Sequence, residues 1–242
     1  MIYGSLAATR AAADSNERRS LFTSHPVLSY LTAEELDHVL GFVTARRYEA
    51  GEVLFCKGDA GQSMMLIAAG KVKVSAFGPD GREAVLAILG PGEICGEMAI
   101  VDNKPRSADA TALEACEVLV LHQRDFLPFL ERNPAVAVRL IAMISERLRR
   151  TSELLEDRML RNLPGRLAKA LLDLGHRGDA PCSPGTRIPL TVRQRVLASM
   201  LGTTRESLNK LLRAWQKEGL IRLERGSVVL ERPDELARLM DS

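Results

Sequence analysis

The feature that most constrains the fold of this chain is a series of short apolar segments separated by glycines. Half of the 18 glycines lie between Gly51 and Gly96. Short strands at regular spacing, divided by Gly, Pro-Asp-Gly and Pro-Gly turns, are typical of an antiparallel barrel or roll. The sequence Pro79-Asp80-Gly81 predicts the turn of one hairpin. The predicted strands are Val53–Phe55, Met64–Ala68, Val72–Ala76, Val85–Leu89, Ala108–Leu113 and Glu117–Leu121.

Helical patterns lie on both sides of these strands. Before them, Thr32 and Glu35 have the spacing of a capping box at a helix start. After Asn133-Pro134, residues of a seam recur at alternating intervals of about 3 and 4, as in a coiled coil. This seam consists of Ile141, Ile144, Leu148, Thr151 and Leu155. The helix is predicted to run to about Asn162, because Pro164 disfavours a helical conformation just before it.

A seam of this length needs an apolar surface to pack on. One alternative is that it packs on the chain's own strands. The other, which we favour, is that it pairs with a second copy in a homodimer, with charged residues on either side of the seam. Glu146, Arg147 and Glu153 are among those charges.

The last third of the chain has the pattern of a small helix-turn-helix unit followed by a hairpin. A helix over residues 164–175 leads into a Gly/Pro-rich segment from Gly175 to Pro189, which predicts a loop. Thr191 and Thr204 are predicted to cap two helices that end near Met200 and Lys217. The other predicted parts are the turn Leu201-Gly202-Thr203, hairpin strands Leu220–Glu224 and Ser227–Leu230 around Arg225-Gly226, and a helix beginning near Pro233.

The second helix of this unit has an apolar face and a polar face. The apolar residues Leu208, Leu211, Leu212 and Trp215 share one side at helical spacing. Arg or Lys can pair with guanine, and Glu can accept from cytosine, so the polar side has the chemistry that reads base edges. The alternative is a solvated charged face, but a tight turn before the helix and a hairpin after it favour binding to double-stranded DNA. The predicted DNA-binding residues are Thr204, Arg205, Glu206, Asn209, Lys210 and Arg213.

Charge and composition agree with this division. Residues 164–242 hold 14 basic and 9 acidic residues, a net charge of +5, whereas residues 1–163 have a net charge of −3. A basic segment on an acidic body is typical of a nucleic-acid-binding part joined to another domain. No run of about 18 apolar residues predicts a membrane span, and the first residues lack the pattern of a signal peptide. We therefore expect a cytoplasmic protein that has no membrane partner.

Metal, disulfide and enzymatic chemistry are not indicated. Cys56, Cys95, Cys116 and Cys182 form no C-x-x-C pair and are expected to be reduced thiols. The four histidines, His25, His38, His122 and His176, show no common spacing that would suggest ligation. The sequence has no nucleophile–base pair, Walker-type glycine loop or H-E-x-x-H motif, so a nucleotide-acting enzyme is only a remote alternative.

The helix that was assigned to DNA carries a specific resemblance. The segment Leu201-Gly-Thr-Thr-Arg-Glu-Ser-Leu-Asn-Lys-Leu-Leu is similar to the recognition element of the cyclic AMP receptor protein (Crp/Fnr) family. That family places an Arg, a Glu and a later Arg on the bases of a TGTGA-type half-site. Arg205 and Glu206 match the first two, but Lys210 stands where the second Arg is expected. Because Arg and Lys are not interchangeable at a bidentate site, the resemblance implies weaker or relaxed reading of that guanine.

The resemblance covers roughly residues 25–232 and implies a ligand. The segment Gly92-Glu-Ile-Cys-Gly-Glu-Met-Ala-Ile, followed by Pro105-Arg-Ser-Ala, resembles the phosphate-binding cassette of cyclic-nucleotide-binding domains. A cyclic phosphate is a monoanion that a guanidinium, a hydroxyl and backbone N–H groups can hold. The resemblance assigns Arg106 and Ser107 to the phosphate and Glu97 to the ribose 2′-hydroxyl. The predicted ligand site consists of Gly96, Glu97, Met98, Arg106, Ser107, Thr151 and Ser152.

The pair Thr151-Ser152 falls on the seam, where an apolar residue was expected. In the nucleotide-binding activators a Thr-Ser pair at the matching point contacts the base, with one residue from each subunit. Cyclic AMP is therefore the expected effector, and no other cofactor is predicted. Cyclic GMP, a cyclic dinucleotide, or no effector at all remain alternatives for the same fold.

These observations predict an α+β fold for a regulator in four parts. The parts are a flexible N-terminal arm (1–20), a cyclic-nucleotide-binding antiparallel β-roll (21–132), a dimerisation helix (133–162) and a winged helix-turn-helix (163–242). Ligand binding is expected to re-aim two recognition helices onto a palindromic site, with half-sites about 34 Å apart. The resemblance also implies RNA polymerase as a partner, and either activation or repression.

Overall fold

The structure is a computed structural model that describes residues 19–20, 31–176, 182–189 and 194–240. The chain divides into two compact units. The first comprises the described residues up to Gly78 and Leu86–Arg147, and the second comprises Pro79–Val85 and the described residues from Leu148 onward. Most of the predicted arm, His25 and the predicted cap Thr191 lie outside the described residues.

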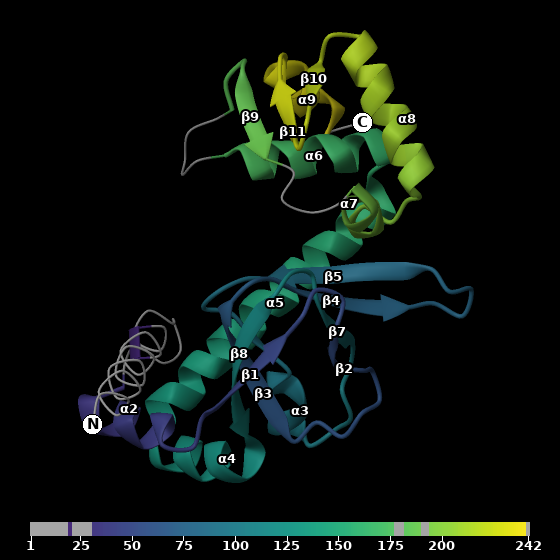
Figure 1. Ribbon diagram of the computed structural model, residues 1–242. Coiled ribbons are helices and arrows are strands. Elements are labelled where there is room, and N and C mark those ends of the chain that lie inside the picture. The colour runs from purple at the N-terminus through teal and green to yellow at the C-terminus, as the bar shows by residue number, and fades with distance from the viewer. Residues whose placement is uncertain (1–18, 21–30, 177–181, 190–193, 241–242) are drawn as a thin grey trace, which may run out of the picture. The chain divides into compact units, whose positions relative to one another are not determined.

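Two antiparallel four-stranded sheets build the first unit, as the glycine-punctuated strands predicted (Figure 1). One sheet has the order β1-β8-β3-β6 and the other the order β2-β7-β4-β5. All of the predicted strands are present, within one or two residues of the expected ends. The strands are β1 (Thr44–Tyr48), β2 (Val53–Phe55), β3 (Ser63–Ala69), β4 (Val72–Phe77), β5 (Glu83–Leu89), β6 (Ile94–Cys95), β7 (Asp109–Ala112) and β8 (Cys116–His122).

Alternating side chains of β3 serve two different cores, because successive residues of a strand point to opposite faces of its sheet. Met64 and Leu66 are buried against helices that cover the outside of the sheet. Met65 and Ile67 are buried between the two sheets, inside the roll. A strand that is buried on both faces reads as a continuous apolar run, which is how Met64–Ala68 appears in the sequence.

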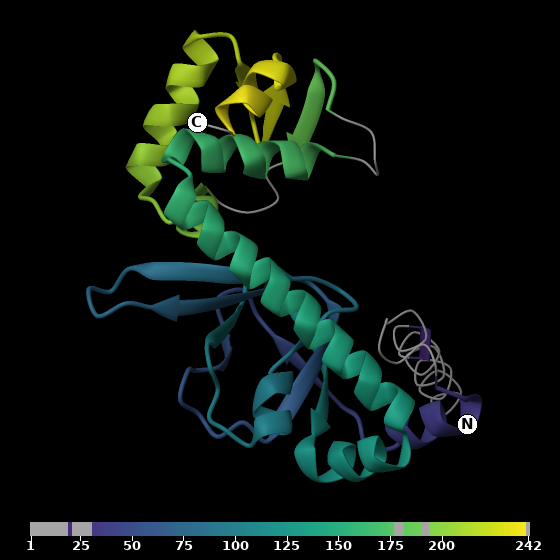
Figure 2. The same ribbon diagram turned by 180° about the vertical axis from the view of Figure 1, so that it is seen from behind.

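Helices that cover the first sheet include α2 (Ala33–Leu40), α4 (Gln123–Arg132) and the first turns of α5 (Pro134–Leu160). Helix α2 begins with the predicted capping box, in which Thr32 and Glu35 exchange hydrogen bonds. Figure 2 shows α4 beside the beginning of α5. Phe126 and Phe129 of α4 and Leu140 of α5 share one buried cluster. The sequence analysis did not predict α4, which contains Pro128.

Helix α5 is continuous from Pro134 to Leu160 and presents two kinds of surface. Val136 and Leu140 are buried on the roll. The residues Ile141, Leu148 and Leu155 of the predicted seam are 63%, 67% and 59% exposed. In this single chain the helix therefore packs on its own strands at one end and leaves much of the seam uncovered.

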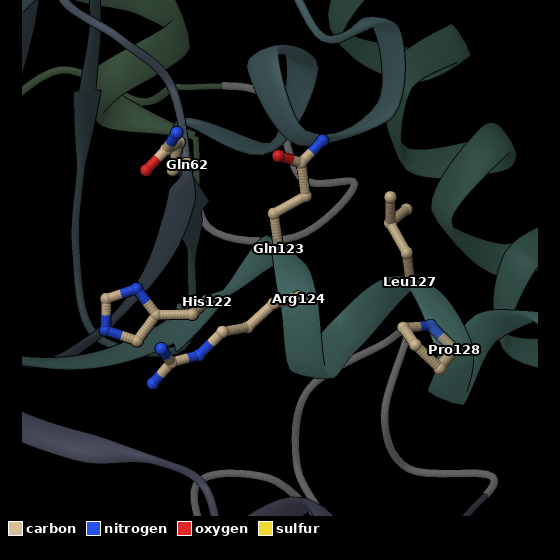
Figure 3. A pocket seen from close by; sticks show the side chains of 6 residues that line it. All are labelled: Gln62, His122, Gln123, Arg124, Leu127 and Pro128. Carbon is tan, nitrogen blue, oxygen red and sulfur yellow. The ribbon is translucent and has the colours of Figure 1, made fainter.

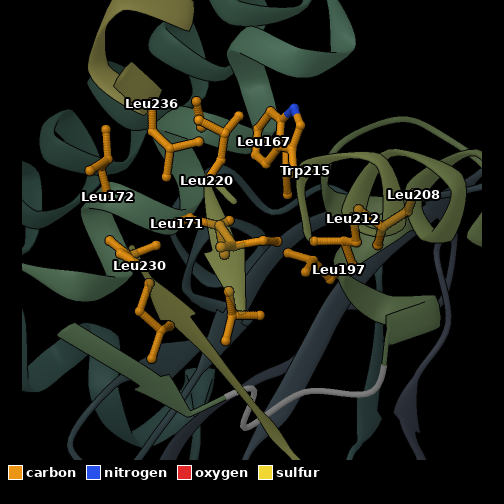
Figure 4. Close-up of a cluster of buried hydrophobic side chains, with 14 of the residues drawn as sticks. Leu167, Leu171, Leu172, Leu197, Leu208, Leu212, Trp215, Leu220, Leu230 and Leu236 are labelled. Atoms are coloured by element: carbon orange, nitrogen blue, oxygen red, sulfur yellow. The ribbon is translucent and has the colours of Figure 1, made fainter. Parts of the chain in front are cut away.

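In the second unit, helices pack around a common core with a small sheet of order β10-β11-β9. Its elements are α6 (Leu163–Gly175), β9 (Thr186–Pro189), α7 (Gln194–Met200), α8 (Arg205–Lys217), β10 (Ile221–Glu224), β11 (Ser227–Leu230) and α9 (Pro233–Leu239). Leu208, Leu212 and Trp215 of α8 lie in the common core, as predicted from their spacing (Figure 4). The antiparallel β-roll, the long helix and the helix-turn-helix confirm the predicted fold class.

One prediction for this unit is wrong. The segment from Gly175 to Pro189 was expected to be a loop, but Thr186–Pro189 forms β9, which pairs with β11. Ile188 is buried, so the strand completes the core as well as the sheet. No helix in the described part of the chain is long and apolar enough to cross a bilayer.

Candidate nucleotide site and DNA-reading surface

The predicted phosphate cassette contains a glycine, Gly96, at which any side chain would displace a neighbouring residue. Gly96 precedes the short helix α3 (Glu97–Asp102) and has φ +79°, in the left-handed region that favours glycine. A Cβ at this position would overlap the guanidinium of Arg106. The glycine therefore lets the backbone approach the arginine that was predicted to hold the phosphate.

Arg106 is buried and forms no ion pair with a carboxylate among the described residues. Its residue is only 5% exposed, Nη1 donates to the carbonyl of Gly96 at 2.8 Å, and Nη2 donates to Oγ of Ser63 at 3.2 Å. The guanidinium also lies 4.3 Å from the ring centroid of Phe55, in a cation–π contact. Burial lowers the pKa of Arg106, although an arginine stays charged at any physiological pH.

One donor of this guanidinium is unused. Nε of Arg106 is buried and has no hydrogen-bond partner in the structure. A buried donor with no acceptor costs about 1–3 kcal/mol, so an anion placed there would relieve an existing penalty. The donor set fits a phosphate monoester or diester, because a guanidinium presents its N–H groups in a fork that matches phosphate oxygens.

Glu97 has a partner that the sequence analysis missed. Arg147 of α5 donates from Nη1 to Glu97 Oε1 at 2.6 Å, and its Nη2 donates to the carbonyl of Ile94. Glu97 is buried, with a side chain that is 4% exposed. The two residues are fifty positions apart in the sequence, and Arg147 had been assigned only to the charged border of the seam. No local pattern in the sequence indicated this ion pair.

Ser107 and Met98 lie at the exposed side of the cassette. Ser107 Oγ is 3.9 Å from Sδ of Met98, a weak contact, and both residues are exposed. The hydroxyl of Ser107 is therefore available to a ligand. Gly96, Glu97, Met98, Arg106 and Ser107 come together in the first unit, whereas Thr151 and Ser152 belong to the second. The hydroxyl of Ser152 donates to the carbonyl of Leu148.

A hollow of about 620 Å³ opens elsewhere on the first unit, where β8 meets α4 (Figure 3). It holds none of the predicted ligand residues. Its lining is Gln62, His122, Gln123, Arg124, Leu127 and Pro128.

The predicted DNA-reading helix begins at a well-defined turn. Gly202 has φ +65°, and the backbone N–H of Thr203 donates to the carbonyl of Ala198. Thr204 Oγ1 then accepts from the backbone N–H of Ser207 at 3.1 Å and caps α8. Thr204 thus has a structural role at the start of the helix, in addition to its predicted place in the DNA-binding set.

The polar face of α8 is presented to solvent. Arg205, Glu206, Lys210 and Arg213 are exposed, and Asn209 is partly exposed among them. Within the described residues, no ion pair or hydrogen bond engages the side chains of Arg205, Glu206, Lys210 and Arg213. By contrast, the strands of the hairpin carry paired charges, such as Arg222 with Glu224 and Glu231. The exposed charges of α8 are therefore available to a binding partner.

Comparison with known proteins agrees with both halves of this arrangement. Residues 45–133 match the family model of the cyclic nucleotide-binding domain, and residues 165–239 match that of the Crp-like helix-turn-helix domain. The chain is 37% identical over 203 residues to the cyclic AMP receptor protein of Thermus thermophilus, covering 84% of this chain and 91% of that protein. The chain belongs to the Crp/Fnr family.

Two further relatives of this Crp/Fnr member differ in the ligand that their names give. A CRP-like cAMP-activated global transcriptional regulator of Mycobacterium tuberculosis is 33% identical over 191 residues, or 79% of this chain and 85% of that protein. The structure of the c-di-GMP responsive global regulator CLP of Xanthomonas campestris is similar with a TM-score of 0.71, at 25% identity over 83% of this chain and 99% of that one. The chain of this structure is therefore a DNA-binding transcription regulator with a cyclic-nucleotide-binding domain, and not an enzyme.

Proposed function

We propose that the protein is a homodimeric transcription regulator that responds to cyclic AMP and binds a palindromic TGTGA-like site. The observation that supports the ligand half is the buried guanidinium of Arg106, whose Nη1 contacts the carbonyl of Gly96 and whose Nε has no partner among the described residues. A buried cation with a free donor is complementary to the single negative charge of a cyclic phosphate. The names of the relatives from Thermus thermophilus and Mycobacterium tuberculosis support cyclic AMP as the effector.

Each predicted ligand residue has a distinct role in this proposal. Arg106 and Ser107 bind the phosphate, and backbone N–H groups after Gly96 add further donors. Glu97 accepts from the ribose 2′-hydroxyl while Arg147 holds its carboxylate in place. Thr151 and Ser152 remain predicted contacts to the base, one from each subunit of the dimer.

The DNA half of the proposal is supported by the exposed polar face of α8 and by the cap at its start. Arg205 and Glu206 read the conserved bases of the half-site, Lys210 reads a guanine with one ammonium group, and Asn209 and Arg213 extend the contact surface. Two such helices on a symmetric dimer fit a palindrome whose half-sites are about 34 Å apart. RNA polymerase is the expected further partner at the promoter.

The homodimer is supported by the uncovered seam of α5. Ile141, Leu148 and Leu155 are separated by seven residues each and remain more than half exposed in the single chain. Apolar residues at heptad spacing are buried efficiently by a second copy of the same helix. A symmetric pair of α5 helices would also bring together the two chains that contribute Thr151 and Ser152.

The experiment is titration calorimetry of the purified protein with cyclic AMP, cyclic GMP and cyclic di-GMP in turn. Saturable binding of cyclic AMP at one per subunit, and loss of that binding in Arg106→Lys, is the expected result. Arg106→Lys keeps the charge but removes Nε, so it separates recognition by the guanidinium from simple electrostatics. Binding of cyclic di-GMP alone would replace the effector and favour the second candidate, which the likeness to the Xanthomonas regulator supports.

A further inference from the structure

The end of α5 is tied to the rest of the second unit by a cluster of charged residues, which we call the junction cluster. It consists of Asp157 and Arg158 in the last turn of α5, Arg161 just after that helix, and Arg166 and Lys169 in α6. None of these residues belongs to the predicted ligand site or to the polar face of α8. All five lie in the second unit.

Asp157 is the centre of the cluster. Its carboxylate accepts from Lys169 Nζ at 2.6 Å and from Arg161 Nε at 2.9 Å, and its side chain is only 16% exposed. Burial alone would raise the pKa of Asp157, but the hydrogen bonds from Lys169 and Arg161 outweigh burial and lower it. The carboxylate is therefore ionised at neutral pH, and its strongest partner lies across the junction in α6.

Two of the three arginines in the cluster, Arg158 and Arg166, reach the turn of the helix-turn-helix. Arg166 donates from Nη1 to the carbonyl of Arg161 at 2.6 Å and from Nε to the carbonyl of Leu201 at 3.1 Å. Arg158 Nη2 donates to the carbonyl of Met200 at 3.4 Å. The last carbonyls of a helix lack partners within the helix and carry partial negative charge. Arg166 therefore joins the C-terminal ends of α5 and α7.

These contacts lie at the connection between α5 and α6, where the backbone alone would not fix the angle between the two helices. Only Arg161 and Asn162 separate the end of α5 from the start of α6. Asn162 caps α6 by accepting from the backbone N–H of Gly165, which fixes the start of α6 but not its direction relative to α5. The side chains of Asp157 and Lys169 make the direct ion pair between the two helices.

We propose that Asp157 and Lys169 are positioning residues for DNA reading. Their ion pair fixes the angle between α5 and α6, and through Arg166 the position of the turn that precedes α8. In a dimer built on α5, this angle sets the separation of the two recognition helices. The expected effect on DNA binding rests on the proposed function. The stabilisation of the angle between α5 and α6 by the ion pair depends on neither ligand nor DNA.

The first test is hydrogen exchange of the full-length protein without ligand or DNA, in Asp157→Asn and Lys169→Met. The backbone N–H groups of Arg161, Gly165 and Arg166 form hydrogen bonds at the junction and report on its opening. We expect exchange about tenfold faster in both variants, since a hydrogen bond to a charged group stabilises strongly. Lys169→Arg, and Arg232→Met in the exposed pair with Glu235, should leave these rates unchanged. Unchanged exchange in Lys169→Met would overturn the proposal.

The second test measures how strictly the protein requires one spacing between half-sites. Anisotropy titrations would use palindromic DNA with the optimal spacer and with spacers one and two base pairs longer or shorter. The wild type is expected to prefer one spacer, and Lys169→Met to lose about tenfold of that preference while Lys169→Arg keeps it. General destabilisation would weaken binding to all spacers alike, and that result would contradict a positioning role. If the wild type bound none of these DNAs, the proposed function would fail, whereas the exchange rates would still decide whether the ion pair holds the junction.

Discussion

The surroundings of Arg106 are the residue-scale basis of the proposed ligand site. The guanidinium is buried, touches the ring of Phe55, and donates to one carbonyl and one hydroxyl, yet no carboxylate neutralises it within hydrogen-bonding distance. Structural arginines in protein interiors are normally paired with a carboxylate. The combination of burial and an unused donor therefore supports the proposal that Arg106 binds an anion.

Gly96 tests this interpretation, because a matched control lies four residues earlier. Gly96 and Gly92 both have φ near +80°, so alanine strains the backbone at either position. Only at Gly96 would the added methyl group collide with Arg106, since nothing lies within 4 Å of a Cβ at Gly92. We expect Gly96→Ala to weaken nucleotide binding at least tenfold in calorimetry and Gly92→Ala to change it little. Equal losses would show that backbone strain, and not displacement of Arg106, governs the site.

Replacing Lys210 by arginine is expected to change the preference of the protein for one DNA base more than its overall affinity for DNA. An arginine can donate two parallel hydrogen bonds to guanine O6 and N7, and a good bidentate pair discriminates by about 1–3 kcal/mol. Lys210→Arg should therefore sharpen the preference for guanine at one position of each half-site by roughly tenfold. Competition binding with half-sites randomised at each position would measure this preference. A uniform rise in affinity at every base would indicate a phosphate contact instead.

The predicted ligand residues Gly96, Glu97, Arg106 and Ser107 could be proposed because they lie within one short motif. Their convergence in the structure follows from local backbone geometry around α3. The partner of Glu97 could not be predicted in this way, since Arg147 comes from a distant helix and its pairing depends on how α5 packs on the roll. A local pattern can thus identify a cassette, but it does not identify the side chain that orients it.

At the scale of elements, helix α5 allows the proposed homodimer to be tested. Its seam residue Leu148 is 67% exposed in the single chain. Leu148→Glu would place a charge at the centre of the proposed helix pair, where burying an unpaired charge is costly. Sedimentation velocity should show a dimer for the wild type and mainly a monomer for Leu148→Glu at micromolar concentration.

Leu174→Glu is the matched control for this variant. Leu174 lies in α6, is 55% exposed and is not part of the seam. The control should sediment as the wild type does. Dissociation by both substitutions would mean that the effect does not come from the seam.

The elements that were missed share a physical reason. Helix α4 contains Pro128, which lacks a backbone N–H and obscures the helical pattern, although Phe126 and Phe129 anchor it in the core. Strand β9 was assigned to a loop because prolines and glycines surround it, yet pairing with β11 and burial of Ile188 stabilise it. Both elements depend on tertiary contacts that outweigh local propensity. Strands β2 to β5 and helix α8 were predictable because their own spacing specifies them, whereas the strands β1 and β6 were not predicted.

For the whole molecule, ligand binding is expected to raise the free energy of unfolding. A ligand that binds only the folded state at a concentration of 100 Kd stabilises it by about 2.7 kcal/mol. For a chain of this size that corresponds to a rise in Tm of roughly 5–10 °C. Differential scanning calorimetry with cyclic AMP should show this rise, and Arg106→Lys should abolish it. An equal rise with inorganic phosphate at the same concentration would show that any small anion satisfies the site.

The unused donor on Arg106 also has a consequence for the amount of regulator in a cell. Without an anion, the roll folds around an unsatisfied buried donor, so a larger fraction of molecules is unfolded at any moment than when the site is filled. Proteases that degrade unfolded chains would then remove the empty regulator faster than the occupied one. The effector would thereby control the lifetime of the protein as well as its affinity for promoter DNA. A fall in nucleotide level would then leave fewer copies of the regulator to respond when that level rises again.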